Sequence, residues 1–231
     1  MKDILSILRN AREKFRYRRW ADDVITSYLP EKNGFRVLDV GCGKNIISKK
    51  PYVLGCDFYP VVRDSVGASA ERLPFKNETF DLVVSAHCLE HSVNVRKVIE
   101  EWARVVKKNG RLWFILPHVD RTFDKTRELT SMAHILKDYE DDVPDEDRTH
   151  WDEFRDRTLL SGHPAIPGHY IVGAKNDDFL FFSSQKLIHH HVWNPETFCD
   201  LVECLGFRVL TSIQKVPGRD DSFSVVVDKA T

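Results

Sequence analysis

The feature that most constrains the fold is an alternation, between residues 35 and 117, of short apolar runs with segments of helical periodicity. Four runs have the length and composition of buried strands, and they read FRVLDV, YVLGCDF, FDLVVSA and GRLWFILP. The segment before the last run has helical spacing and ends at Asn109 and Gly110, which predicts a helix that stops there. Strands that alternate with helices predict an α/β, Rossmann-like, doubly wound sheet with helices on both faces.

The segments on either side of this core complete the predicted domain. Residues 1–34 have the apolar spacing of an amphipathic helix, which we expect to cap the core. Residues 194–231 predict a helix that starts after Asn194 and ends at Gly206, and then two closing strands joined by a Pro-Gly turn. The whole chain is therefore expected to form one domain around a mostly parallel, seven-stranded sheet.

A long segment, residues 118–193, interrupts the pattern after the core at residues 35–117. It is rich in Asp, Glu and His and poor in strand signals. Connections of this length in compact domains usually form lids or binding elements. We therefore predict a substrate lid inserted after the run GRLWFILP, which would be the fifth strand of the seven-stranded sheet.

Composition narrows the possible partners and location. The net charge of the 231 residues is −1, which gives no reason to expect nucleic acid or an anionic membrane as a partner. The first helix has a basic cluster, and such a cluster is usually a solvated face, although it could meet an acidic ligand. No apolar run approaches the roughly 20 residues that cross a bilayer. Five cysteines without a Cys-x-x-Cys pair favour free thiols in a reducing cytoplasm.

The stretch VLDVGCGKNII places Asp39 at the end of the first strand and glycines at positions 41 and 43. Glycines at such a turn let the backbone approach a ligand closely, although many strand-to-helix turns contain two glycines for structural reasons alone. Asp57 ends the next strand, where a carboxylate can accept both hydroxyls of a ribose. A Leu-Pro-Phe turn precedes the third strand, and the polar loop AHCLEHS follows it.

Together, these motifs resemble the class I S-adenosylmethionine-dependent methyltransferases, in the branch that has Leu-Pro-Phe and then Phe-Asp. The resemblance covers residues 35–117 and implies S-adenosylmethionine as the cofactor. The residues that it assigns to the cofactor follow the strand ends; they are Asp39, Gly41, Gly43, Asp57, Phe58, Ala70, Glu71 and His87. It implies that the first three line the methionine end, that Asp57 binds the ribose, and that Phe58, Ala70 and Glu71 lie near the adenine. His87 is expected near the sulfonium.

Two positions depart from the family pattern and leave alternatives open. Asn45 stands where many members have a third glycine, and Ser69 stands where many have an acid that binds the adenine amino group. These departures allow a protein that binds the cofactor without turnover. A nicotinamide-dependent oxidoreductase is the other alternative, but its pyrophosphate site favours the full Gly-x-Gly-x-x-Gly pattern, which this chain lacks.

Methyl transfer requires alignment of the acceptor, and a hydroxyl acceptor also benefits from a base. Histidine is the side chain that titrates near neutral pH, and His118, His150 and His191 are the candidates for base or substrate contact. The lid resembles those of small methyltransferases of glycan biosynthesis. We therefore expect a small polar or glycan-type acceptor, methylated at oxygen.

Three pairs within the predicted lid have matching local spacing. They are His134 with Asp138, His150 with Glu153, and His189 with His191. The first two pairs would each share one face of a helix, and the third would share one side of a strand. If the pairs converge, they could bind Zn²⁺, Mn²⁺ or Fe²⁺, or form a pocket for a polar substrate. The other interpretation is a flexible lid whose histidines bond to neighbouring carboxylates.

Overall fold

A computed structural model describes residues 2–28, 34–62, 65–145, 147–161, 183–184 and 186–229. Its centre is a seven-stranded sheet in the order β3-β2-β1-β4-β5-β7-β6. The strands are β1 (Val37–Val40), β2 (Val53–Asp57), β3 (Val66–Gly67), β4 (Phe80–Ala86), β5 (Val106–Pro117), β6 (Phe207–Ile213) and β7 (Ser222–Lys229). Only β7 runs antiparallel to its neighbours, so the predicted mostly parallel sheet is confirmed.

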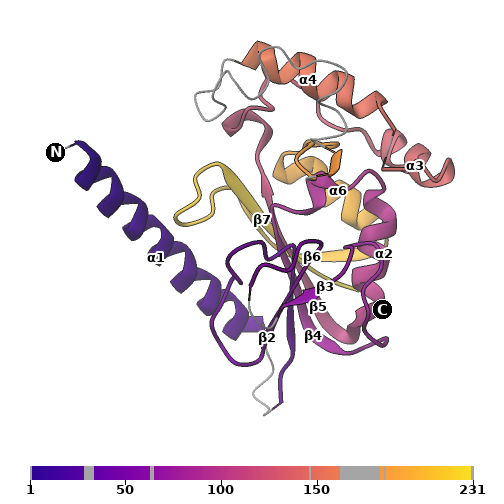
Figure 1. Ribbon diagram of the computed structural model, residues 1–231. Coiled ribbons are helices and arrows are strands. Elements are labelled where there is room, and N and C mark those ends of the chain that lie inside the picture. Colours follow the sequence, from indigo (N-terminus) through magenta and orange to yellow (C-terminus); the bar gives the residue numbers. More distant parts are fainter. Residues whose placement is uncertain are drawn as a thin grey trace.

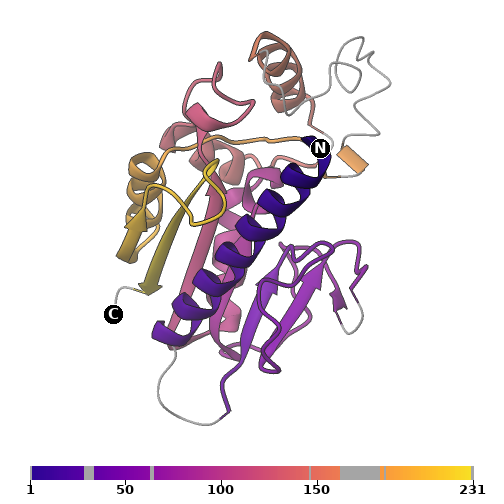
Figure 2. The ribbon, with the colours of Figure 1, turned by 90° about the vertical axis from the view of Figure 1, so that its left-hand side faces the viewer.

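Helices cover both faces of the sheet (Figures 1 and 2). The described helices are α1 (Lys2–Tyr28), α2 (Val95–Val105), α3 (Met132–Glu140), α4 (Thr149–Ser161) and α6 (Pro195–Cys204), with the short 3₁₀ helices η1 (Leu89–His91) and η2 (Val119–Arg121). On one face, α1 buries Ala21 and Ile25 against a cluster that includes Trp113 of β5. On the other face, Trp102 of α2 and Phe198 of α6 belong to the larger core cluster. Buried aromatic side chains therefore hold the helices against each face of the sheet.

The C-terminal helix has the boundaries that its local signals predict. Asn194 caps α6 by accepting a hydrogen bond from the backbone N–H of Thr197, and the Thr197 hydroxyl completes a capping box. Pro195 occupies the first turn, and Gly206 follows the helix with a φ of +85°. The interacting residues are close together in the sequence, so the boundaries of α6 can be predicted from the sequence alone.

The predicted end of α2 is wrong. The helix ends at Val105, and Asn109 and Gly110 lie inside β5, which begins at Val106. Val106 already pairs with Phe80 of β4, and the register shifts before Leu82 pairs with Arg111. A Cβ on Gly110 would lie 2.7 Å from the carbonyl oxygen of Asp81, so the glycine serves a close approach between strands and not a helix stop.

The predicted lid contains η2, α3 and α4, which lie beyond one end of the sheet in Figure 1. Residues 146, 162–182 and 185 of the same prediction lie outside the described part of the chain. None of the helices that the structure describes is long and apolar enough to cross a membrane.

Candidate active site

The turn after β1 allows two strand ends to meet closely. Gly41 and Gly43 have φ values of +73° and +53°, which L side chains rarely adopt. A Cβ on Gly41 would lie 2.5 Å from the Cβ of Cys88, whereas a Cβ on Gly43 would meet nothing within 4 Å. The Gly41 N–H donates to the carbonyl oxygen of Cys56 at 2.8 Å. This backbone path brings the ends of β1, β2 and β4 together.

Two carboxylates lie beside this turn in different environments. Asp57 is oriented at the end of β2 because one oxygen accepts from the Gly43 N–H at 2.8 Å and the other from the Tyr59 N–H at 2.9 Å. Asp39 is buried and accepts from the Ile47 N–H at 2.6 Å. Burial raises the pKa of Asp39 to about 7, against the opposing effect of that hydrogen bond.

A hollow of about 260 Å³ opens at these strand ends. Its lining includes every residue that the resemblance assigns to the cofactor except Asp39: Gly41, Gly43, Asp57, Phe58, Ala70, Glu71 and His87. Ligands of open α/β sheets bind in such crevices at the carboxyl ends of strands. We call this hollow the strand-end hollow.

A second hollow, of about 550 Å³, lies on the other side of the glycine turn. Gly41 and Gly43 line both hollows, and Asp39 lines the second. Lys14 and Arg18 of α1, together with Arg219, contribute positive charge to its lining. The basic cluster of the first helix is therefore not entirely a solvated face.

The loop after β4 presents two neutral histidines and a buried acid. His87 has a φ of +55°, an uncommon value for a residue other than glycine. Burial lowers the pKa values of His87 and His91 to about 3, and burial raises that of Glu90 to about 7. Both carboxyl oxygens of Glu90 are buried without a hydrogen-bond donor among the described residues.

The tautomers of these histidines follow from their partners. The Ser222 hydroxyl donates to Asp221, so it accepts from the Nε2–H of His87 at 2.7 Å. The Nδ1–H of His91 donates to a backbone carbonyl at 3.0 Å. Each ring therefore turns its free nitrogen toward the same oxygen of Glu90, at 3.7 Å. Sequence reasoning missed Glu90, although it follows His87 closely in the loop at the strand end.

The three predicted catalytic histidines do not come together. His118 caps η2 by accepting from the Asp120 N–H, and it does not line either hollow at the glycine turn. His150 and His191 lie in a different cluster, with His134 and Asp138. His87 and His91 are the histidines that line the strand-end hollow.

The paired spacings within the lid converge in part. His134, Asp138, His150 and His191 gather into one group, which we call the lid cluster. Glu153, which was expected beside His150, forms an ion pair with Arg127 instead.

His189 and His191 do not share one side of a strand, because residues 187–192 form no strand. His189 instead pairs with Asp124 at 2.7 Å. Burial opposes the charge of His189, but the Asp124 carboxylate raises its pKa overall. Arg127 holds the backbone here by donating to the carbonyl oxygens of His189 and His190.

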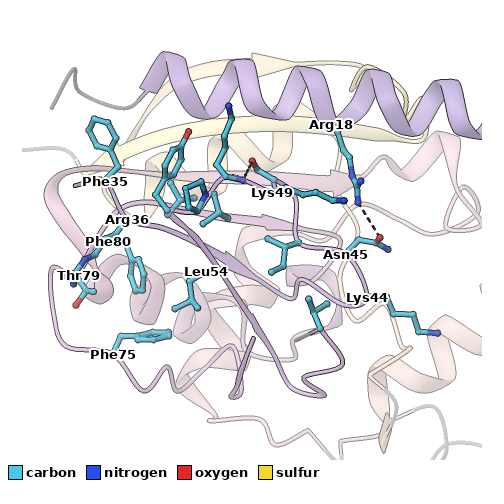
Figure 3. Close-up of a pocket in the computed structure, with 18 residues that line it drawn as sticks. Arg18, Phe35, Arg36, Lys44, Asn45, Lys49, Leu54, Phe75, Thr79 and Phe80 are labelled. Atoms are coloured by element: carbon cyan, nitrogen blue, oxygen red, sulfur yellow. Dashed lines mark hydrogen bonds between the residues drawn. The ribbon is translucent and has the colours of Figure 1, made fainter. Parts of the chain in front are cut away.

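A larger hollow, of about 1050 Å³, adjoins the second hollow, because Arg18, Lys44, Asn45 and Ile46 line both (Figure 3). Its lining includes Phe35, Leu54, Phe75 and Phe80, and none of the residues assigned to the cofactor. Residues 41–52, which connect β1 to β2, form no helix, so this part of the sheet has less cover.

Comparisons with known proteins agree with this geometry. Residues 38–114 match the family described as the methyltransferase domain. An uncharacterized protein of Methanocaldococcus jannaschii is 34% identical over 103 residues, covering 38% of this chain and 44% of that protein. Demethylmenaquinone methyltransferase of Paenarthrobacter aurescens is 33% identical over 112 residues, covering 41% of this chain and 43% of that enzyme.

The fold has solved counterparts. An S-adenosylmethionine-dependent methyltransferase of Mesorhizobium loti aligns with a TM-score of 0.50 and 14% identity, covering 89% of this chain and 95% of that one. These matches support the resemblance to the class I S-adenosylmethionine-dependent methyltransferases, and the seven-stranded sheet confirms the predicted Rossmann-like fold. It spans less than half the length of the two curated relatives described above.

Proposed function

We propose that this chain transfers a methyl group from S-adenosylmethionine to a hydroxyl oxygen of a small polar or glycan-type acceptor. One observation carries the proposal: seven residues from four separate segments, each assigned to the cofactor on sequence grounds, line a single hollow at the strand ends. The lining of that hollow also includes the charged side chains of Glu71 and Lys186, which favour a polar acceptor over an apolar one.

The residues present suit an adenosine group in the strand-end hollow. Asp57 is oriented by two backbone N–H groups, and each of its oxygens keeps a lone pair for a ribose hydroxyl. The Phe58 ring is half exposed beside it and offers a face to the adenine. The positive charges of the second hollow suit the carboxylate of the methionine group, and Asp39, which lines the same hollow, would bind its ammonium.

When bound, S-adenosylmethionine supplies a methyl group on a sulfonium, which a well-placed nucleophile displaces in line. The main task of the chain is then to hold the acceptor at attack distance, an effect that can contribute roughly 10 kcal/mol. Its second task is to take up the proton that a hydroxyl acceptor releases.

Glu90 has the properties of that proton acceptor. Its pKa of about 7 lies in the range where a base accepts a proton efficiently at neutral pH. The free nitrogens of His87 and His91 face it, and both rings line the hollow, so either nitrogen can take the proton from the acceptor and then donate it to Glu90. The catalytic roles expected for His118, His150 and His191 stay predictions.

Ligand binding and methyl transfer test the proposal separately. S-adenosylhomocysteine should raise the melting temperature of the chain, and Asp57→Ala should remove most of that rise. Tritiated methyl groups should enter the small-molecule or glycan fraction of a cell extract. Glu90→Gln should bind S-adenosylhomocysteine normally and transfer methyl slowly. An unchanged melting temperature of the unsubstituted chain would overturn the cofactor assignment, and label found only in nucleic acid or protein would overturn the acceptor class.

A further inference from the structure

The lid cluster joins three segments that are distant in sequence. His134 and Asp138 lie one turn apart on α3, His150 lies in the first turn of α4, and His191 lies before α6. Asp138, His150 and His191 are at least nine-tenths buried, whereas 41% of the His134 side chain is exposed. The cluster is separate from the proposed cofactor site, because none of its members lines the strand-end hollow or the second hollow.

The spacing of the side-chain atoms matches the coordination sphere of a small cation. The Nε2 atoms of His134 and His150 are 2.8 Å apart. The Oδ2 atom of Asp138 lies 3.3 Å from the first of these nitrogens, 3.4 Å from the second and 3.7 Å from Nε2 of His191. A tetrahedral Zn²⁺ with bonds of about 2.0–2.1 Å separates its ligand atoms by about 3.3 Å.

The hydrogen bonding of the cluster is incomplete without a cation. Asp138 Oδ2 is buried and receives no hydrogen bond from any described residue, although three imidazoles surround it. An unpaired buried carboxylate is strongly disfavoured. A divalent cation would give this oxygen a partner and would replace the hydrogen bond between the Nε2 atoms of His134 and His150.

We propose that His134, Asp138, His150 and His191 bind one divalent transition-metal ion, with Zn²⁺ as the best fit, and that the ion clamps the lid. Imidazole and carboxylate ligands in a four-coordinate set favour Zn²⁺ over Mg²⁺ or Ca²⁺, which prefer six or more oxygens. His191 Nε2 donates to the carbonyl oxygen of Val93 at 2.9 Å, so binding of the ion would break this hydrogen bond and move the ring proton to Nδ1.

The clamp has a structural role because it joins three segments of the lid, two of which are also bonded to the core. The side chain of Asn94, the N-cap of α2, donates to the backbone carbonyl of Asp138 at 3.3 Å. The neighbouring His190 N–H donates to the carbonyl oxygen of Glu90 at 2.7 Å. An ion at the lid cluster would therefore hold α3 and α4 against the loop that faces the strand-end hollow.

Metal content and affinity test this proposal on the whole chain. After treatment with a chelator, the chain should bind one Zn²⁺ in competition with a chromophoric chelator, and its melting temperature should rise. His134→Gln is the principal variant because this ring is partly exposed and its replacement leaves the buried packing in place. Its Zn²⁺ affinity should fall on the order of 100-fold or more, since even loss of a residue outside the ligand set costs 10–100-fold.

Two further variants place the ion. Asp138→Asn should lose Zn²⁺ in the same way, whereas Asp141→Asn, which removes an exposed carboxylate at the end of the same helix, should bind it normally. The proposal is overturned if the chelator-treated chain binds no Zn²⁺, or if His134→Gln keeps full affinity. It is also overturned if His91→Gln abolishes binding while His134→Gln does not, because the ion would then belong to the group of Glu90, His91 and His189. Binding of S-adenosylhomocysteine, measured in parallel, keeps this result distinct from the proposed methyl transfer.

Discussion

At the scale of single residues, the glycine turn shows two positions with similar backbone angles and different surroundings. Gly41 and Gly43 both have positive φ, but only Gly41 has another side chain, that of Cys88, where its own Cβ would be. The sequence predicted both as ligand-binding glycines. The requirement at Gly41 comes from the packing of the loop after β4 against the turn after β1, which the spacing of the motif does not reveal.

Gly43→Ala and Gly41→Ala therefore form a matched pair. Gly43→Ala should lower the free energy of unfolding by about 1–2 kcal/mol, the cost of a left-handed conformation for alanine. Gly41→Ala should lower it by a further 1–3 kcal/mol or so, because the new methyl group overlaps Cys88. Urea denaturation measures both values, and equal losses would contradict the packing argument.

Asp39 provides a pH-dependent prediction. Its pKa is raised from 3.8 to about 7 by burial, so the folded chain keeps a proton that the unfolded chain releases above pH 4. The stability from this group is therefore present below about pH 4, falls as pH rises to about 7, and is constant above that. Asp39→Asn keeps an acceptor for the Ile47 N–H and removes the titration. Urea denaturation between pH 5 and pH 8 should show the unsubstituted chain losing stability relative to this variant, and parallel profiles would contradict the argument.

At the scale of elements, local signals were sufficient where the structure is held by local bonds. The boundaries of α6 followed from its cap, its proline and its glycine, all of which act within one turn. The end of α2 could not be predicted in this way, because Val106 leaves the helix to pair with Phe80 in a distant strand. The strand β3 has only two residues, too few for any periodicity.

The real cap and the apparent stop can be compared directly. Asn194→Ala should lower the free energy of unfolding by about 1 kcal/mol, because the Thr197 N–H loses its acceptor. Asn109→Ala should change it by less than about 0.5 kcal/mol, because Asn109 is exposed and caps no helix. Denaturation curves of the two variants test this difference. If Asn109→Ala lowered the free energy of unfolding more than Asn194→Ala does, that result would support the helix end predicted at Asn109 and Gly110.

At the scale of the whole molecule, the sites combine segments whose meeting depends on the path of the chain. Helical spacing correctly placed His134 beside Asp138, but the arrival of His150 and His191 depends on how α4 and the segment before α6 fold back. The segment before α6 is held by a backbone bond to the core, from the His190 N–H to the carbonyl oxygen of Glu90 at 2.7 Å. Long-range pairing of this kind leaves no signal in the spacing of residues along the chain.

The cofactor site also combines segments that are distant in sequence, because it includes side chains of α1. Lys14 and Arg18 lie in α1, far in sequence from the glycine turn, yet both donate to the side chain of Asn45 within the second hollow. If the methionine carboxylate lies there, the double variant Lys14→Met/Arg18→Met should weaken S-adenosylhomocysteine binding about tenfold at low salt. The reason is that two exposed charge interactions are each worth up to about 1 kcal/mol.

The matched control is Arg9→Met/Arg19→Met, which removes the same charge from α1 at positions that do not line the hollow. Its affinity for S-adenosylhomocysteine should stay near that of the unsubstituted chain, and the difference between the two double variants should shrink in 0.5 M salt, where the screening length falls to about 4–5 Å. Calorimetric titrations at low and high salt measure both effects. Equal losses in the two variants would show that α1 acts through its overall charge, because only a local contact distinguishes the charges inside the hollow from those outside it.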